Sequence, residues 1–241
     1  MPRSGGGKMK NYIENIKSDA PEHMQMTIVD SSDLEQLAGL FALEKRWADN
    51  SSVNVFDVTG SCHPDYIGLS WLEMLDKGKR MPLNIKLLME NPGYYFQDTQ
   101  KSPTMYYAKI GKDLFVTSDG NHRTCLAKVL FYYEQRTDLQ GVVLEEIIKD
   151  SELELVFRQL SETPEIQKTG IRIEVQSKHI SRMDASGWKS DRYVPVISAR
   201  NKNFDKIELN APEALDFLTE LKSGHFTRLF RHNRYAKFIK G

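Results

Sequence analysis

Five consecutive residues, Asp119-Gly120-Asn121-His122-Arg123, bring together an acid, an amide, an imidazole and a guanidinium. They follow a run of strand-forming residues, Leu114 to Ser118, and precede an apolar helical pattern that continues to about Arg136. At such a turn the first backbone N–H groups of the helix have no partner within the helix, and the helix dipole favours negative charge. The segment therefore predicts an anion site, and phosphate is the anion that suits these residue types.

Each side chain of this segment has a role in such a site. Gly120 lets a phosphate approach the backbone closely, and Arg123 offers two parallel N–H donors to phosphate oxygens. His122 could donate to the anion or transfer a proton, while Asp119 could cap the helix or hold Mg²⁺ beside a phosphate. The plainer alternative is an N-cap at Asp119 and a solvated Arg123. The predicted catalytic residues are His122 and Asp119, the predicted metal ligand is Asp119, and the predicted phosphate- or nucleotide-binding residues are Gly120, Asn121, His122, Arg123 and Thr124.

A hairpin must position this segment. In residues 104–118, two runs typical of strands flank Gly111-Lys112-Asp113, a turn of suitable composition. Upstream, residues 31–50 predict a long helix, with Ser32 and Glu35 as a capping box. The pattern further predicts a short strand over 53–60 and a helix over 64–78, and it leaves 81–93 open between strand and helix.

The C-terminal half predicts a second group of elements. Residues 144–160 form an acidic stretch with a helical pattern, and 179–192 read as a polar surface loop. Strands are expected over 170–180, 192–199 and 203–209, followed by a helix capped by Asn210 and Glu213. The fold class is α+β, with a flexible Gly-rich leader. The expected divisions are 1–50 (leader and helix), 51–140 (a mixed core with the motif) and 141–241 (an accessory portion with a basic tail).

The formal net charge of zero conceals a division along the chain. Residues 138–165 hold eight acids and two bases, whereas residues 168–202 hold eight bases and three acids. The last twenty residues contain six Lys or Arg and no acid, interleaved with aromatic residues. Such a tail either binds nucleic acid or forms a terminal helix whose aromatics pack on the core. The predicted nucleic-acid-binding residues are Arg228, Arg231, Arg234, Lys237 and Lys240.

The stretch VTSDGNHRTCLAKVL resembles the signature of the ParB/sulfiredoxin superfamily, in which a strand ends in a G-x-[HR]-R element that opens a helix. The resemblance is to the branch whose motif is D-G-Q-H-R or D-G-x-R-R, and it covers roughly residues 55–137. It implies a small mixed sheet with helices and a phosphate site at the motif, in a DNA-binding or nucleotide-binding protein of a mobile genetic element. By the same resemblance, Mg²⁺ and a nucleoside triphosphate are the expected cofactors, and nuclease or triphosphatase activity is compatible with the motif.

The sequence departs from this family in two places. Sulfiredoxins carry a nucleophilic Cys where this chain has Asn121, and ParB proteins that bind cytidine triphosphate carry Arg-Arg where this chain has His122-Arg123. Cys125 lies further into the helix, where we expect it to face the packing. These differences argue against sulfinic-acid reduction and against a triphosphate switch of the ParB kind.

Composition limits the remaining classes of function. Two cysteines, Cys62 and Cys125, give neither a disulfide framework nor a zinc pattern and suit a cytoplasmic protein. No apolar run approaches the roughly 20 residues that cross a bilayer, so no membrane partner is expected. DNA is the expected partner and an oligomer is compatible with the sequence. Two alternatives stay open: an enzyme that modifies a small phosphorylated substrate through His122, and a non-catalytic plasmid or phage interaction protein.

Overall fold

The computed structural model describes residues 5–223 and 234–241, and it is of the mixed α+β class. Two compact units divide the chain. Unit 1 consists of residues 1–36, 45–147 and 183–190, and unit 2 consists of residues 37–44, 148–182 and 191–241. The boundaries near residues 50 and 140 stay predictions. No helix within the described ranges is both long and apolar enough to span a bilayer.

Unit 1 contains a mixed sheet in the order β1-β3-β5-β4-β6-β2. The pairs β1–β3, β3–β5 and β4–β6 are parallel, whereas β4 and β5 form the antiparallel hairpin that the sequence predicts. The strands are β1 (Val29–Asp30), β2 (Ala42–Asn54), β3 (Val58–Ser61), β4 (Tyr106–Ile110), β5 (Asp113–Val116) and β6 (Asp138–Lys149).

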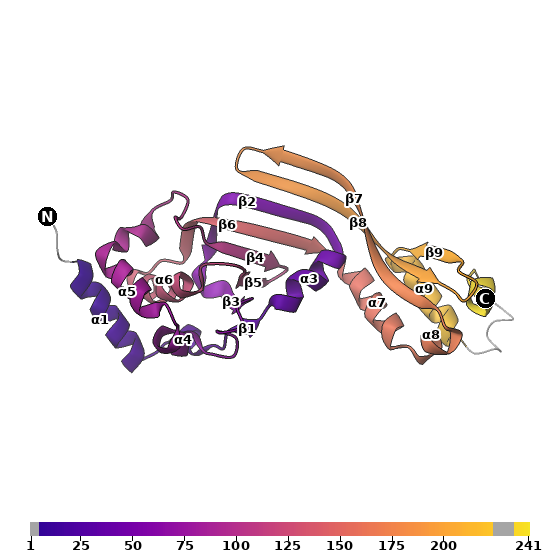
Figure 1. Ribbon diagram of the computed structural model, residues 1–241, viewed down its shortest axis with the longest axis horizontal. Helices are drawn as coiled ribbons and strands as arrows, with labels where there is room; N and C mark the ends of the chain where they lie inside the picture. Colours follow the sequence, from indigo (N-terminus) through magenta and orange to yellow (C-terminus); the bar gives the residue numbers. More distant parts are fainter. Residues whose placement is uncertain (1–4, 224–233) are drawn as a thin grey trace. The chain divides into compact units, whose positions relative to one another are not determined.

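Helix α6 (Asn121–Glu134) is the central helix of unit 1 and begins where the sequence predicts it. It packs against α1, α4 and α5, as Figure 1 shows. Its residues Cys125 to Phe131 are all buried, and Cys125 donates a hydrogen bond to the carbonyl of Trp71, which agrees with the packing role expected for it. The other helical segments are α1 (Gly5–Ser18), α2 (Glu22–Gln25), α3 (Ser32–Leu40), α4 (Trp71–Lys77), α5 (Met81–Glu90) and the 3-10 turns η1 (Val55–Asp57) and η2 (Pro92–Phe96).

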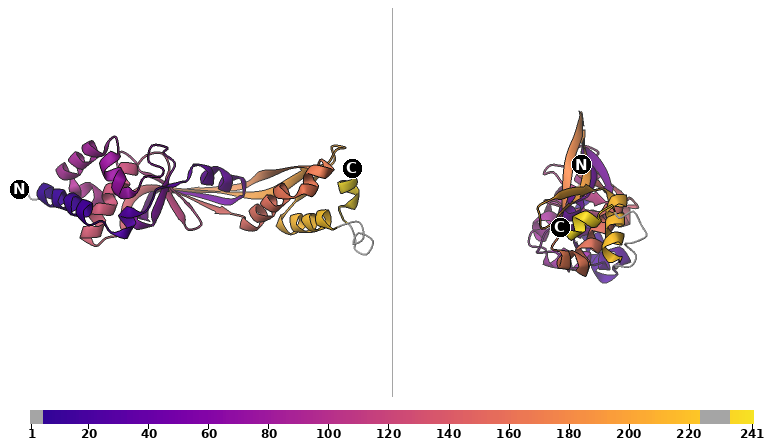
Figure 2. Two further views of the ribbon diagram at one scale, coloured as in Figure 1. Left: turned by 90° about the horizontal axis from the view of Figure 1, so that it is seen from below. Right: turned by 90° about the vertical axis from the view of Figure 1, so that its right-hand side faces the viewer.

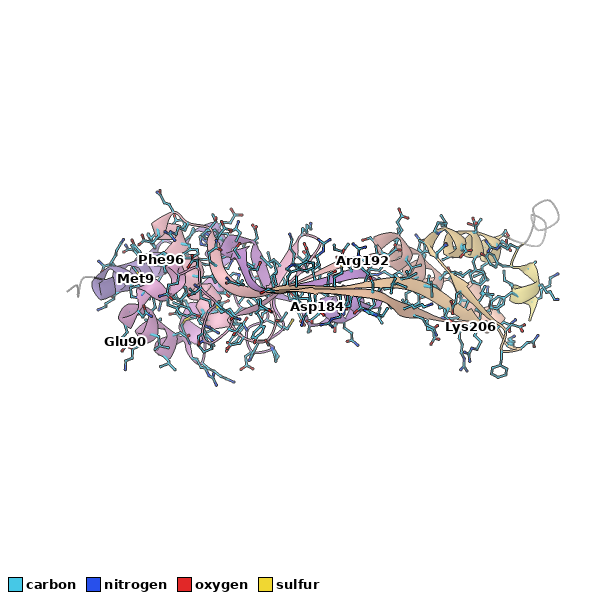
Figure 3. The ribbon with its side chains drawn as sticks, turned by 90° about the horizontal axis from the view of Figure 1, so that it is seen from above. Met9, Glu90, Phe96, Asp184, Arg192 and Lys206 are labelled. Carbon is cyan, nitrogen blue, oxygen red and sulfur yellow. The ribbon has the colours of Figure 1, made fainter. Side chains whose placement is uncertain are left out.

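From Gly5 onward the N-terminal segment is helical, whereas the sequence predicts a flexible leader. Met9, Ile13 and Ile16 fall on one face of α1 and are buried in the core of unit 1, so the helix is held by apolar burial. Phe96, labelled with Met9 in Figure 3, packs against the same core. The low helix propensity of the glycines is overcome by these tertiary contacts.

The long helix predicted over residues 31–50 is wrong in its second half. Helix α3 ends at Leu40, and Ala42–Asn54 form strand β2 beside β6. This segment contains charged residues that favour helices, but it forms a strand because pairing within the sheet outweighs its local helix propensity. The predicted capping box is also absent, since Ser32 is already helical and its N–H and hydroxyl donate to Asp30.

Two other expectations near the motif are refined. The helix predicted over 64–78 begins only at Trp71, where Ser70 and Glu73 form a capping box that the sequence reading overlooked. Residues 81–93, left open between strand and helix, form α5 and the start of η2.

Unit 2 contains most of β7 (Arg172–Ala185) and of β8 (Trp188–Arg200), whose adjoining ends within 183–190 belong to unit 1. It also contains β9 (Lys206–Leu209), which is antiparallel to β8. Helices α7 (Ser151–Glu162) and α9 (Ala211–Lys222) lie alongside each other in Figure 2 and share its core. The short helices are α8 (Pro164–Thr169) and α10 (Ala236–Lys240). The capping box of Asn210 and Glu213 at α9 is confirmed.

Two predictions for the C-terminal half are wrong. The acidic stretch 144–160 is not one helix, because strand β6 continues to Lys149 and Asp150 then caps α7 by accepting from the N–H of Leu153. The polar segment 179–192 is not a loop, because it forms the ends of β7 and β8 around a turn at Gly187, whose φ is +81°. A strand is recognised in a sequence by alternating apolar and polar residues, which reflect one buried and one exposed face. This segment is polar on both faces, so that alternation is missing.

Candidate functional site

The start of α6 lines a cavity of about 760 Å³, which we call the α6 cavity. Its volume lies within the range of pockets that hold small-molecule ligands. It lies entirely within unit 1 and receives residues from the turn before α4, from α5 and η2, and from the motif itself. Its lining residues include Asp65, Lys79, Arg80, Leu83, Leu87, Tyr94, Asp119, Asn121, His122 and Arg123.

Gly120 allows the chain to turn into α6. Its φ is +129°, a conformation that residues with a Cβ rarely adopt, and a Cβ there would lie 3.3 Å from that of Met105. The backbone N–H of Thr124 donates to the carbonyl of Gly120 and starts the helical ladder. Across the described residues, the N–H groups of Asn121, His122 and Arg123 donate to no protein acceptor. These are the free amides that the sequence predicts.

The side chain of Asn121 is fixed by a short relay. The N–H of His63 donates to the Ser61 hydroxyl at 2.9 Å, and that hydroxyl donates to Asn121 Oδ1 at 2.8 Å. Because the relay occupies the oxygen, it assigns the NH₂ group of Asn121 to the other side. Asn121 is only 5% exposed and lines the α6 cavity, and its NH₂ group has no acceptor among the described residues. A fixed donor of this kind suits an anionic or carbonyl oxygen.

Arg123 does not present the open fork that the sequence predicts. Its side chain is 10% exposed and forms a 3.0 Å ion pair with Asp119. It also donates to the Tyr94 hydroxyl at 2.7 Å, to the Thr104 carbonyl at 3.0 Å and to the Pro103 carbonyl. Four of its five N–H donors are therefore used within the protein. The expectation of a bidentate phosphate clamp at Arg123 is corrected: the guanidinium ties the loop before β4 to the start of α6.

The side chain of His122 is also hydrogen-bonded within the protein. The N–H of Arg80 donates to His122 Nε2 at 3.3 Å, and the Tyr66 hydroxyl lies 3.2 Å from the same nitrogen. Burial, with the nearby charge of Arg80, lowers the pKa of His122 from its ordinary value. The neutral ring with an unprotonated Nε2 is therefore favoured, and this nitrogen already accepts a hydrogen bond from the backbone N–H of Arg80.

Thr124 lies away from the α6 cavity. It is fully buried, its Oγ1 lies 2.6 Å from the Tyr107 hydroxyl, and it donates to the Gly120 carbonyl at 2.9 Å. Its hydroxyl therefore stabilises the turn and does not reach a ligand, contrary to the expectation that it binds phosphate.

Arg80 is the residue of the cavity that the sequence analysis overlooked. It is exposed at the start of α5, and its guanidinium forms no hydrogen bond or ion pair with any described residue. The other two cations of the cavity are paired, Lys79 with Asp65 at 2.6 Å and Arg123 with Asp119. Arg80 thus supplies the unneutralised positive charge. No spacing rule in the segment KGKR distinguishes Arg80 from its basic neighbours.

The cavity does not fit a metal ion held by the protein alone. Within residues 5–223 and 234–241, no three His, Cys, Asp or Glu side chains gather closely enough to hold one. Asp119 is alone and paired with Arg123, whereas Mg²⁺ needs a near-octahedral set of oxygen ligands.

The basic tail is only partly described. Arg228 and Arg231 lie outside the described residues. Arg234 pairs with Glu213 at 2.9 Å, and Lys237 and Lys240 are exposed on α10. Tyr235 and Phe238 pack their rings against Phe217 of α9, so these two aromatics are held by the core of unit 2.

No family model, curated protein or solved structure matches this chain. The resemblance to the ParB/sulfiredoxin superfamily rests on the motif and stays a prediction.

Proposed function

We propose that the α6 cavity binds the phosphate-bearing part of a nucleotide or nucleic acid, in a DNA-associated protein of the ParB-like type that the motif suggests. The observation that carries this proposal is the set of unpaired donors at the start of α6. The free amides of Asn121, His122 and Arg123 and the oriented NH₂ group of Asn121 all belong to residues that line it. Such donors, at the positive end of a helix dipole, favour an oxyanion.

Charge supports an anionic ligand. Three cations and two carboxylates line the α6 cavity, and both carboxylates are already paired. Arg80 therefore leaves a net positive charge close to the start of α6, and its N–H bond to His122 fixes its backbone there. A guanidinium with free donors binds phosphate through two parallel hydrogen bonds.

The apolar part of the lining supports a ligand that is more than an inorganic ion. Leu83 and Leu87 lie one helical turn apart on α5 and are 55% and 52% exposed. Tyr94 adds an aromatic ring whose hydroxyl is fixed by Arg123. Apolar and aromatic side chains that share a cavity with oxyanion donors suit a molecule with a planar base and a phosphate.

The proposal is one of binding. His122 and Asp119, the two residues that the sequence nominates for nuclease or triphosphatase chemistry, are both engaged by protein partners. A general base must be able to accept the proton of its substrate, and Nε2 of His122 already accepts the Arg80 N–H. We therefore assign no catalytic step to either residue.

Arg80→Ala tests the proposal. We expect at least one ribonucleoside triphosphate, added without metal at about 100 times its Kd, to raise the Tm of the unmodified chain by about 5 °C. Loss of a charge-assisted pair should weaken binding by about 10- to 100-fold in Arg80→Ala. Differential scanning fluorimetry across a concentration series measures both effects.

Lys86→Ala is the matched control, because Lys86 is an exposed cation of the same helix that does not line the cavity. It should bind like the unmodified chain. The proposal is wrong if none of the four triphosphates raises the Tm, or if Arg80→Ala and Lys86→Ala bind equally well.

A further inference from the structure

The loop between β8 and β9 presents a second feature that points to a ligand, in unit 2 and independent of the α6 cavity. Phe204 is 79% exposed, more than any other large hydrophobic residue of the described chain. Its φ is +67°, in the left-handed region, where a bulky residue is an outlier and Gly or Asn is preferred. Lys206, labelled in Figure 3, begins β9 directly after this loop.

The buried side chain of Asn201 holds the loop in this conformation. Its Oδ1 accepts from the N–H groups of Asn203 and Asp205, both at 3.0 Å. Its Nδ2 donates to Asp205 Oδ2 at 3.1 Å and to the carbonyl of Phe238 at 3.2 Å. The loop is therefore rigidly built and is joined to α10, the helix that contains Phe238.

The fold gains nothing evident from a phenylalanine at this position. An exposed ring contributes little burial, and its backbone conformation is unfavourable for a residue with a Cβ. A side chain that is unfavourable for folding yet rigidly presented is typical of a binding anchor, because little conformational freedom is lost when it meets a partner.

The surroundings of Phe204 select the kind of partner. Its neighbours Lys202, Asn203, Asp205 and Lys206 are all exposed and polar, so the ring does not belong to a continuous apolar patch of the type that protein partners cover. Positive charge is available instead. Lys202, Lys237 and Lys240 are exposed and form no ion pair within the described ranges.

We propose that the Phe204 loop and α10 form a docking site for single-stranded nucleic acid. An unpaired base stacks on the Phe204 ring, and the adjoining phosphates lie near Lys202, Lys237 and Lys240. Stacking on an aromatic ring combined with a basic track is how sequence-tolerant single-strand binding sites work. A duplex, whose bases are already stacked, gains nothing from the ring.

Phe204→Gly is a clean test, because glycine adopts φ +67° without strain and the variant should fold at least as stably as the unmodified chain. With a fluorescein-labelled twelve-residue oligo-dT, fluorescence anisotropy should show affinity falling about tenfold. Phe204→Tyr retains a stacking ring and should keep most of the affinity. Leu155→Ala removes another exposed apolar residue of unit 2, on α7, and should leave binding unchanged.

Lys237→Ala/Lys240→Ala tests the basic track. Removing two phosphate contacts to a single strand should lower the slope of log K against log salt by about 1.4. Failure of the unmodified chain to bind oligo-dT overturns the proposal, as does equal affinity of Phe204→Gly and the unmodified chain. Self-association through Phe204 without oligo-dT binding would also overturn it. Nucleotide-induced thermal shifts in Phe204→Gly report on the α6 cavity separately, so the two proposals can fail independently.

Discussion

Arg123→Ala is expected to lower the free energy of unfolding of unit 1 by about 2–4 kcal/mol. The guanidinium is nearly buried, and its removal leaves the carbonyls of Pro103 and Thr104 and the hydroxyl of Tyr94 without their donor. These acceptors are half-buried or exposed, so each loses a charge-assisted hydrogen bond and is only partly compensated by water. Asp119, being largely exposed, is hydrated again and adds little.

Urea denaturation followed by tryptophan fluorescence measures this loss. All three tryptophans, Trp47, Trp71 and Trp188, belong to unit 1, so the signal reports that unit. Arg136→Ala is the matched control: Arg136 is exposed and stacks over Phe96 with 4.9 Å between the guanidinium carbon and the ring centroid. It should cost about 1 kcal/mol or less. Equal stability of the two variants would show that Arg123 does not anchor the loop.

Lys128 should make the stability of unit 1 depend on pH in the alkaline range. This lysine of α6 is 1% exposed, donates to the Val58 carbonyl at 2.9 Å and lies over the Trp71 ring. Burial lowers its pKa from the ordinary 10.5 to about 8. Between these two values the unfolded chain binds more protons than the folded chain, so stability rises as pH increases.

The expected gain from Lys128 is about 3 kcal/mol as pH rises from 8 to 10.5. Lys128→Met has nearly the same volume and no charge, so its stability should lack this contribution. The quantity to measure is the difference in unfolding free energy between the unmodified chain and Lys128→Met at several pH values. Lys112→Met, in the exposed turn between β4 and β5, is the control and should follow the unmodified chain. A difference that stays constant over this range would mean that Lys128 is not a strained buried cation.

The local signals near the motif predicted its backbone well. The β4–β5 hairpin, the glycine turn and the start of α6 depend on neighbouring residues, so turn composition and periodicity were sufficient. Cys125 falls on the buried side of α6 for the same reason. By contrast, Ala42–Asn54 have a helical composition and become a strand only because sheet partners far along the chain are present.

The side-chain roles depended on contacts that no local pattern contains. Arg123 donates hydrogen bonds to carbonyl groups about twenty residues upstream. These bonds use the guanidinium N–H groups that the motif predicts to bind phosphate. Arg80 reaches the cavity because its N–H bonds to His122, 42 positions later. Likewise, Phe204 is an ordinary aromatic residue in the sequence, and its left-handed backbone and exposure emerge only from the folded loop. The sequence thus predicted which segment lines the cavity better than it predicted the role of each side chain.

The amide resonances of Asn121, His122 and Arg123 test the central claim most directly. In ¹H–¹⁵N spectra of the unmodified chain, titration with inorganic pyrophosphate and then with ribonucleoside triphosphates should shift these three resonances saturably. The amide of Gly111, in the turn between β4 and β5, should stay in place. Three amides that remain unshifted while ligand reaches millimolar concentration would contradict an oxyanion site at the start of α6.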